Sequence, residues 1–334
     1  MMAELRAGLI GLGMMGRNHA RVLASLEGVE LVGVADPAGD VHGAVTGVPV
    51  VTDLSELLAI GIDYAMVSTP TRYHLQTALA LAEAGVHALI EKPITVDVAS
   101  AHRIADAFGE AELVGAVGHI ERYNPALQQA RTRIAHGDLG EIYQITTRRQ
   151  GPFPGRIADV GVILDLATHD IDLTAWVAQQ QYASVSARTA HRSGRPHEDL
   201  VAVTGVLANG TVTNHLVNWL SPVKERVTMI TGDKGAFVAD TLTADLTYFE
   251  NGMVPTEGTL ATFRGVSEGN MVRYAFPKPE PLRTEHEHFR DAVLGKPADI
   301  VTLKQAAATV AVANSVARAA TESVVVDIPQ GAVW

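Results

Sequence analysis

A glycine-rich loop at the start of an alternating strand and helix pattern constrains the fold of this chain most. The loop reads Gly11-Leu12-Gly13-Met14-Met15-Gly16 and follows the apolar run Ala7-Gly8-Leu9-Ile10. Glycines in this pattern allow a tight turn, a close approach of the backbone to a pyrophosphate, and close packing of the next helix on the strand. The N-terminus of that helix offers bare N–H groups and the positive end of its dipole to the phosphates. The loop therefore predicts a dinucleotide-binding unit.

An acidic residue at the end of the next strand-like segment indicates which dinucleotide binds. Asp36 lies 20 residues after Gly16, the usual spacing for a carboxylate that accepts a hydrogen bond from the ribose 2′-hydroxyl. The following Pro37-Ala38-Gly39 contains no Arg or Lys to pair with a 2′-phosphate. We therefore predict NAD rather than NADP. The alternative is a glycine turn in some other α/β protein, with Asp36 as a turn residue.

Strands and helices alternate along residues 5 to about 118, which predicts an N-terminal, doubly wound parallel sheet of the Rossmann type. The expected strands are 6–10, 29–35, 48–51, 63–68, 86–90 and 113–117, and the expected helices are 14–26, 53–59, 73–84, 97–107 and 123–135.

After about residue 140 the segments are rich in Val and Thr, and Asn209-Gly210 between two of them is a hairpin signal. We expect a C-terminal α/β domain with an open, mostly antiparallel sheet, a long irregular connection over 250–281, and closing helices at 283–294 and 303–320. The predicted domains are 1–122 for NAD binding and 123–334 for substrate binding and oligomerisation, with helix 303–320 able to pack back on the first.

Composition narrows the class of partner. The chain of 334 residues has a net charge of −11 and contains no cysteine. The negative charge argues against nucleic acid and anionic membranes as partners, and the lack of cysteine excludes disulfides and Cys-ligated metals. We find no signal-peptide pattern and no apolar stretch near the ~20 residues that span a bilayer. We therefore expect a cytoplasmic protein.

Ligands of open α/β sheets bind beyond the C-terminal ends of the strands. Lys92 lies at such an end, in Glu91-Lys92-Pro93, and is a candidate for catalysis; the alternative is a surface lysine after a strand. We expect the cofactor to contact the loop and strand-end residues Gly11, Gly13, Met14, Met15, Gly16, Asp36, Ser68, Thr69, Pro70, Thr71, His74, Glu91 and Lys92.

A second cluster lies in the segment Gly161 to Leu173, whose apolar spacing predicts a helix. Asp165 and His169 are then four residues apart on one helix face. A carboxylate beside an imidazole fixes its tautomer and stabilises its protonated form, as a general base needs. A buried His–Asp pair that only packs the helix explains the spacing equally well. A metal site with Asp172 is disfavoured because a zinc site needs more ligands, and we predict no metal.

The run Glu285-His286-Glu287-His288 also resembles a set of metal ligands. His286 and His288 do not share a helix face. We therefore expect a solvated first helical turn.

Taken together, these motifs resemble the glucose–fructose oxidoreductase/inositol dehydrogenase/MocA (Gfo/Idh/MocA) family. The resemblance rests on the glycine loop with Asn18-His19-Ala20, on Asp36-Pro37, Ser68-Thr69-Pro70 and Glu91-Lys92-Pro93, and on the segment from Leu164 to Asp172. It implies an NAD-dependent sugar dehydrogenase that forms a homodimer or homotetramer, with Lys92, Asp165 and His169 around the reacting carbon.

Two further segments, 118–125 and 151–161, resemble the UDP-N-acetylglucosamine 3-dehydrogenase branch of this family. That resemblance implies oxidation of the 3-hydroxyl of a UDP-N-acetylhexosamine. The substrate contacts that we expect are Arg122, Tyr123, Asn124, Arg156, Asp165 and His169, the two arginines facing the diphosphate or the uridine. The alternatives are a dehydrogenase of a free polyol or monosaccharide, of the inositol type, and a non-catalytic NAD(H)-binding regulator.

Overall fold

The chain folds into two compact units, each with its own sheet. The computed structural model describes residues 4–155, 160–252 and 268–329. The first unit comprises 1–120 and 280–311, and the second comprises 121–279 and 312–334. Within the described residues, none of the helices is long and apolar enough to cross a membrane.

The first unit is built on a parallel sheet of six strands within the described residues, in the order β3-β2-β1-β4-β5-β6. This order is that of a dinucleotide-binding Rossmann sheet, so the predicted fold class is confirmed. The order reverses at β1, where the glycine loop begins. The strands are β1 (Leu5–Ile10), β2 (Val29–Ala35), β3 (Val50–Val51), β4 (Tyr64–Val67), β5 (His87–Glu91) and β6 (Gly115–Gly118).

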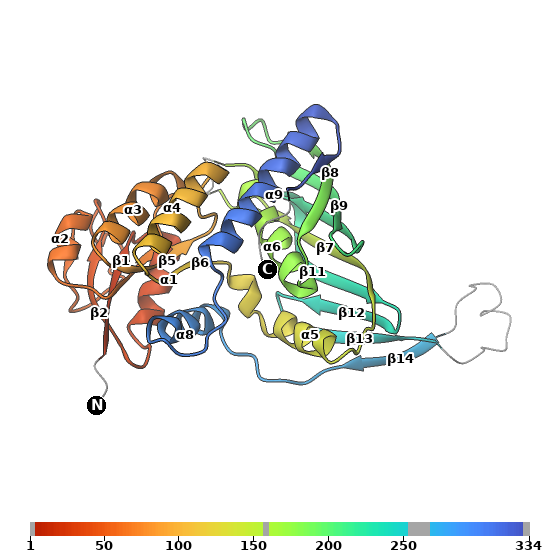
Figure 1. The fold of residues 1–334 in the computed structure, drawn as a ribbon, viewed down its shortest axis with the longest axis horizontal. Helices are drawn as coiled ribbons and strands as arrows, with labels where there is room; N and C mark the ends of the chain where they lie inside the picture. Colours follow the sequence, from red (N-terminus) through yellow and green to blue (C-terminus); the bar gives the residue numbers. More distant parts are fainter. Residues whose placement is uncertain (1–3, 156–159, 253–267, 330–334) are drawn as a thin grey trace. The chain divides into compact units, whose positions relative to one another are not determined.

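Both faces of this sheet are covered by helices, as the near-continuous apolar strands predict. One face packs on α2, α3, α4 and the first half of α9, and the other packs on α1 and α8 (Figure 1). The helices are α1 (Met14–Leu23), α2 (Leu54–Ala59), α3 (His74–Glu83), α4 (Val98–Glu110), α8 (Pro281–Val293) and α9 (Leu303–Glu322).

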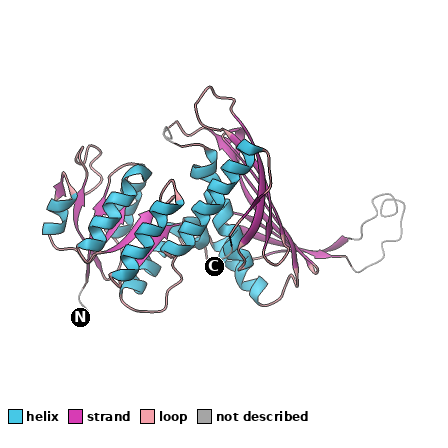
Figure 2. Ribbon diagram, turned by 45° about the horizontal axis from the view of Figure 1, so that its top comes forward, coloured by secondary structure: helices cyan, strands magenta, loops and turns pink. Residues whose placement is uncertain are grey.

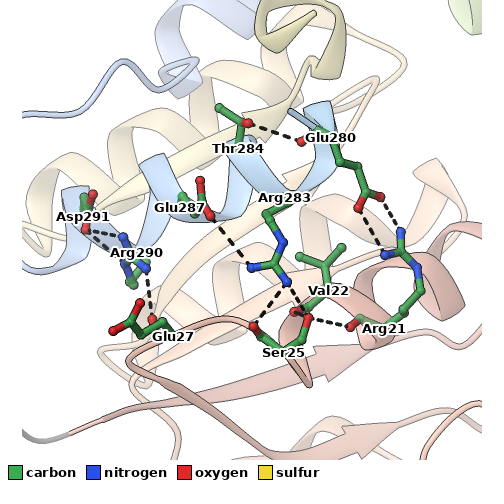
Figure 3. A network of polar contacts seen from close by, with 10 residues as sticks. All are labelled: Arg21, Val22, Ser25, Glu27, Glu280, Arg283, Thr284, Glu287, Arg290 and Asp291. Carbon is green, nitrogen blue, oxygen red and sulfur yellow. Dashed lines mark hydrogen bonds and ion pairs between the residues drawn. The ribbon is translucent and has the colours of Figure 1, made fainter. Parts of the chain in front are cut away.

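Helix α8 is part of the first unit, although the predicted boundaries placed it in the second. Its Phe289 is 1% exposed and joins the apolar core beneath the sheet. Polar contacts also tie it to α1: Arg21 pairs with Glu280, and Arg283 donates to the Ser25 hydroxyl (Figure 3). The sequence prediction missed this return because it followed chain order, whereas the apolar face of α8 matches the uncovered side of β1 and β4.

The second unit is built on a nine-stranded sheet within the described residues, in the order β14-β13-β12-β11-β7-β10-β9-β8-β15. Only the β7–β10 pairing is parallel among these described strands, which confirms the mostly antiparallel sheet. The strands are β7 (Ile142–Pro152), β8 (Tyr182–Ala190), β9 (Leu200–Leu207), β10 (Val212–Asn218), β11 (Leu220–Gly232), β12 (Gly235–Asp240), β13 (Asp245–Asn251), β14 (Glu268–Arg273) and β15 (Val326–Asp327).

The expectation of an irregular connection over 250–281 is wrong at 250–251 and at 268–273, which lie in strands, whereas 274–280 is irregular as expected. β13 runs to Asn251, and β14 pairs with it from Glu268 onwards. The sequence has glycines at 252, 258, 265 and 269, and because glycine disfavours strands, this pair of edge strands was not predicted. Edge strands are also exposed, so their apolar alternation is weak.

Helices cover one face of the second sheet (Figure 2). They are α5 (Pro125–Ala135), the π-helical turn η3 (Ile163–Ala167) with the following α6 (Thr168–Ala178), and the second half of α9. The other face carries exposed apolar side chains, among them Leu216, Met229 and Phe249. The covered face is therefore the one that positions buried polar groups.

Candidate active site

The glycine loop at the end of β1 has the shape that a pyrophosphate needs. Gly11 has a φ of +93°, and a Cβ there would lie 2.9 Å from the carbonyl oxygen of Ser68. A Cβ on Gly16 would collide with the carbonyl oxygen of Gly11. Around Gly13, by contrast, a Cβ would meet no atom of the described structure within 4 Å. Gly13 also begins helix α1 without a side-chain cap, so the backbone here faces open space.

Asp36 at the end of β2 holds this loop. Its Oδ2 accepts from the backbone N–H of Leu12 at 2.7 Å, and its Oδ1 accepts from that of Ala38 at 2.8 Å. Each carboxylate oxygen has a second lone pair. The carboxylate can therefore also accept from a ribose hydroxyl, and these features fit a bound NAD.

Two of the predicted cofactor contacts, Ser68 and His74, also support the loops around them. The Ser68 hydroxyl donates to the carbonyl oxygen of Gly11 at 2.8 Å. The buried His74 ring places Nε2 2.8 Å from the carbonyl oxygen of Thr69 and Nδ1 3.0 Å from that of Pro93. Burial lowers the pKa of His74. The ring links the end of β4 to the segment after Lys92.

The hydroxyl of Thr69 lies beside these contacts. It is buried, and no hydrogen-bond partner for it occurs among the described residues. Pro70 and Thr71 follow at the start of the turn η1 (Thr71–Tyr73). An orphaned hydroxyl at a strand end beside the glycine loop is a group that a cofactor can satisfy.

Lys92 directly follows β5, and its backbone N–H donates to Oε2 of Glu91 at 3.0 Å. The Glu91 side chain is buried at the strand end, and its Oε1 lies 3.0 Å from Nε2 of His19 on α1. The lysine is half-buried. The structure thus places Lys92 in the same unit as the glycine loop, at an adjacent group of strand ends.

In the second unit, Asp165 and His169 lie on one continuous helical segment that changes its winding between them. Asp165 is in the π-turn η3, and His169 is in the first turn of α6. They are 6% and 7% exposed, respectively. π-Turns inside helices often mark functional sites. The sequence predicted one regular helix here, and the extra residue in the turn could not be read from apolar spacing.

Two buried ion pairs fix the segment that carries His169. Nε of Arg149 donates to Asp170 at 2.8 Å, and its Nη1 donates to Glu121 at 2.8 Å. Arg122 donates from Nε and Nη2 to both oxygens of Asp172, at 2.8 and 2.6 Å. Burial disfavours the charge of Arg149, but the two carboxylates outweigh it and raise the pKa of its guanidinium. The helix is therefore clamped on both sides by charges.

The predicted substrate contacts at 122–124 have structural partners. Arg122 is 3% exposed and bound to Asp172, and Tyr123 is equally buried. Asn124 caps α5 by accepting from the N–H of Ala126 and donates to the carbonyl oxygen of Thr241. A contact between Arg122 and a substrate diphosphate stays a prediction, and this burial does not favour it. Arg156 lies outside the described residues.

No group of three or more His, Cys, Asp or Glu side chains in the described part of the chain is placed to hold a metal ion. Asp172, the third member of the metal alternative, instead forms the ion pair with Arg122. Lys92, Asp165 and His169 offer an ammonium group, a carboxylate and an imidazole.

Comparisons with known proteins identify the family. Residues 5–119 match the NAD-binding Rossmann fold of the GFO/IDH/MocA oxidoreductase family, and residues 127–238 match its C-terminal domain. The chain belongs to the Gfo/Idh/MocA family. Its first unit is thus an NAD-binding Rossmann domain.

Several family members are similar to this chain. UDP-N-acetylglucosamine 3-dehydrogenase of Acidithiobacillus ferrooxidans is 33% identical over 64% of this chain and 66% of its own length. Inositol 2-dehydrogenase 4 of Saccharopolyspora erythraea is 32% identical over 55% and 57%. Each alignment thus spans less than two thirds of these curated Gfo/Idh/MocA relatives. A crystal structure of the Acidithiobacillus enzyme, GnnA, matches with a TM-score of 0.84 and 28% identity, over 95% of this chain and 98% of that one.

Sequence reasoning about this Gfo/Idh/MocA chain missed some buried groups. Glu285 and His286 were expected in a solvated turn, but they are 1% and 0% exposed. The apolar residues Leu282 and Phe289 share their helix face, and that spacing was the available signal. The clamp residue Arg149 gave no signal, because a charged residue in a strand ordinarily faces solvent.

Proposed function

We propose that this protein is an NAD-dependent dehydrogenase of a sugar secondary hydroxyl, and that its substrate is the 3-hydroxyl of a UDP-N-acetylhexosamine. The observation that carries the substrate class is the similarity to GnnA over 95% of this chain. The reaction class rests on a Rossmann domain with Lys92 at a strand end, and on the buried Asp165 and His169 in the family's C-terminal domain.

NAD, when bound, supplies the hydride acceptor. The chain's own residues do the rest of the chemistry. His169 takes the proton of the reacting hydroxyl, and Asp165 stabilises the imidazolium that results. Lys92 donates a hydrogen bond to the same oxygen and stabilises the negative charge that develops there. In the reverse direction the same residues reduce a ketone.

A second candidate is the oxidation of a free polyol. The similarity to inositol 2-dehydrogenase 4, at 32% identity, favours it. Both substrates present a secondary hydroxyl, so the proposed roles of Lys92 and His169 stay the same. The two candidates differ only in whether the enzyme requires a nucleotide on the substrate.

The test is NADH formation with NAD and a panel of UDP-N-acetylglucosamine, its uronic acid, free N-acetylglucosamine and myo-inositol. Turnover confined to the UDP-sugars supports the proposal. Turnover on inositol or the free sugar rejects the UDP requirement and keeps the reaction class. NAD binding without turnover in either direction would favour a non-catalytic NAD(H)-binding regulator.

We also propose that copies of the chain associate through the open face of the second sheet. Val212, Leu216, Met229 and Phe249 are between 36% and 42% exposed there. Exposed apolar groups on one face favour association. A Met229→Glu variant that remains the same size in solution as the unmodified protein would reject this interface.

A further inference from the structure

A chain of buried hydrogen bonds joins three elements of the first unit behind Lys92. Nε2 of His286 on α8 lies 2.8 Å from Nδ1 of His19 on α1. Nε2 of His19 lies 3.0 Å from Oε1 of Glu91, and Oε2 of Glu91 accepts from the N–H of Lys92 at 3.0 Å. Both imidazoles are fully buried. These hydrogen bonds therefore connect helix α8 to the backbone of the candidate catalytic lysine, Lys92.

One arrangement of the protons satisfies every contact of these hydrogen-bonded residues and also leaves none of their buried ring N–H groups without an acceptor. Glu91 accepts from the backbone N–H of Lys92, which can only donate. An ionised carboxylate also needs a donor at its other oxygen, so Nε2 of His19 carries a proton. In this arrangement His19 has a lone pair at Nδ1, and that atom accepts a hydrogen bond from the Nε2–H of His286. Within this hydrogen-bonded series, only Nδ1 of His286, which carries a lone pair, then lacks a partner among the described residues.

The surroundings favour an ionised Glu91 and a neutral His286. Burial alone would raise the pKa of Glu91, but the hydrogen bond from His19 and the charge of Lys92 lower it. Burial lowers the pKa of His286, which keeps that ring neutral. Burial and the charge of Glu91 raise the pKa of Glu285, which lies beside His286 in sequence. Glu91 is thus the anion of this cluster.

We propose that His286 and His19 are positioning residues that orient the Glu91 carboxylate and, through it, the backbone of Lys92. This proposal rests on the proposed role of Lys92 in the dehydrogenase reaction. It assigns a function to α8, a helix that lies about 190 residues after Lys92 in sequence and offers no side chain to the predicted NAD contacts. A histidine pair that merely packs α8 on α1 would affect stability, but not the reactivity of Lys92.

The first experiment removes the remote donor and then restores it. His286→Leu should lower kcat about tenfold, the effect of one lost buried hydrogen bond of roughly 1.4 kcal/mol, with the Kd of NAD within about twofold. His286→Gln, whose amide can donate to His19, should recover most of that loss. His288→Leu is the matched control, because His288 is on the same helix and accepts from the N–H of Asp299 instead.

Three results would overturn the proposal. One is an equal kcat for His286→Leu and His288→Leu. Another is a fall of NAD affinity in step with kcat, which would place the defect in the glycine loop. The third is a failure of His286→Gln to recover activity when that variant is as stable to heat as the unmodified protein.

The second experiment tests whether the direction of the chain matters. Both groups that face the Glu91 carboxylate, Nε2–H of His19 and the backbone N–H of Lys92, are donors. In Glu91→Gln the amide NH₂ must therefore face one of these two donors. The mismatch at His19 is relieved only if both histidines exchange tautomers, and that leaves a buried N–H on His286 unsatisfied. We therefore expect Glu91→Gln to lower kcat less in the His286→Leu background than in the unmodified enzyme. Additive losses in this double-mutant cycle would contradict the proposal.

A measurement independent of turnover separates this proposal from the proposed function. Nitrogen-15 NMR of the NAD-bound protein should show His19 and His286 both protonated at Nε2 only, and Glu91→Gln should move both protons to Nδ1. If the two histidines exchange tautomers in this way in a protein that has no activity on the sugar panel, the proposed positioning by His286 and His19 stands and only the substrate class is rejected. A His19 ring in the Nδ1–H form in the unmodified protein would refute the proposed positioning of Glu91 by the two histidines.

Discussion

The two units fix a candidate catalytic residue in different ways. In the first, two imidazoles and a carboxylate form a series of hydrogen bonds from His286 through His19 to Glu91, next to Lys92. In the second, the arginines Arg149 and Arg122 clamp the helix that carries His169 by ion pairs to the neighbouring Asp170 and Asp172. The histidines can move a proton from one ring nitrogen to the other, whereas the arginines keep their protons.

The difference follows from the chemistry of the two candidates. Arginine stays charged under all ordinary conditions, so its ion pairs hold a helix without titrating themselves. An imidazole chain is weaker but sets the direction of each hydrogen bond, which suits a position where one backbone N–H must be held. Loss of a clamp should therefore reduce stability most, whereas loss of a chain member should reduce turnover most.

The largest effect is expected on stability, from breaking the buried ion pair between Arg122 and Asp172. Arg122→Leu leaves Asp172 as an uncompensated charge that is 1% exposed, which should lower the free energy of unfolding of the second unit by about 3–5 kcal/mol. Chemical denaturation with a probe in that unit measures it.

Two further variants check the cause of that loss. Arg122→Leu combined with Asp172→Leu should recover much of the stability, because no lone charge then remains. Arg273→Leu is the control, since its ion pair with Asp245 is on the surface, with the arginine 67% exposed, and should change unfolding by less than about 1 kcal/mol. Equal losses for Arg122→Leu and Arg273→Leu would show that the clamp does not stabilise the helix.

The next effect concerns turnover. Lys92→Ala and His169→Ala should each lower kcat about 100-fold, or about 2.7 kcal/mol, while NAD still binds, because neither residue belongs to the glycine loop. Steady-state rates and NAD titration measure the two quantities. Lys296→Ala, which removes a surface lysine paired with Asp291, is the control. Rates within a few-fold of the unmodified enzyme would reject the roles assigned to Lys92 and His169.

The same contrast shows what sequence can predict. The glycine loop, Asp36 and the strand ends follow from local patterns, and the six-stranded sheet could be predicted because a helix follows every one of its strands except β2. The ion pairs of Arg149 could not, because a charged residue in a strand ordinarily faces solvent. The burial of His286 could have been inferred from the spacing of Leu282 and Phe289, but its partner His19 is too distant in sequence to predict. The π-turn at Asp165 was missed because one extra residue does not alter the apolar spacing enough.

A smaller effect is expected at Glu285 and depends on pH. Burial and Glu91 raise the pKa of Glu285 well above its usual 4.5, so the native state keeps a proton that the unfolded state releases. Stability is then lost as pH rises above 4.5, by about 1.4 kcal/mol for each pH unit, until the pKa of the folded state is reached.

Glu285→Gln removes that loss. Its advantage over the unmodified protein should grow as the pH rises from 5 to 7, as measured by denaturation at each pH. Glu287→Gln, on the same helix but with a side chain 40% exposed, should show no such growth. A constant difference between Glu285→Gln and the unmodified protein across this interval would mean that Glu285 is ionised in the folded protein.

The smallest effect on the fold is expected within the glycine loop, where stability and binding separate at neighbouring positions. An alanine Cβ at Gly13 meets no described atom within 4 Å, whereas at Gly16 it would press on the carbonyl oxygen of Gly11. Gly13→Ala should thus change the free energy of unfolding by less than about 0.5 kcal/mol but weaken NAD binding, because the methyl group occupies the space that the phosphates need. Gly16→Ala should reduce both. If Gly13→Ala binds NAD as tightly as the unmodified protein, the open space at Gly13 is not where the pyrophosphate lies, and the cofactor must approach the loop from another side.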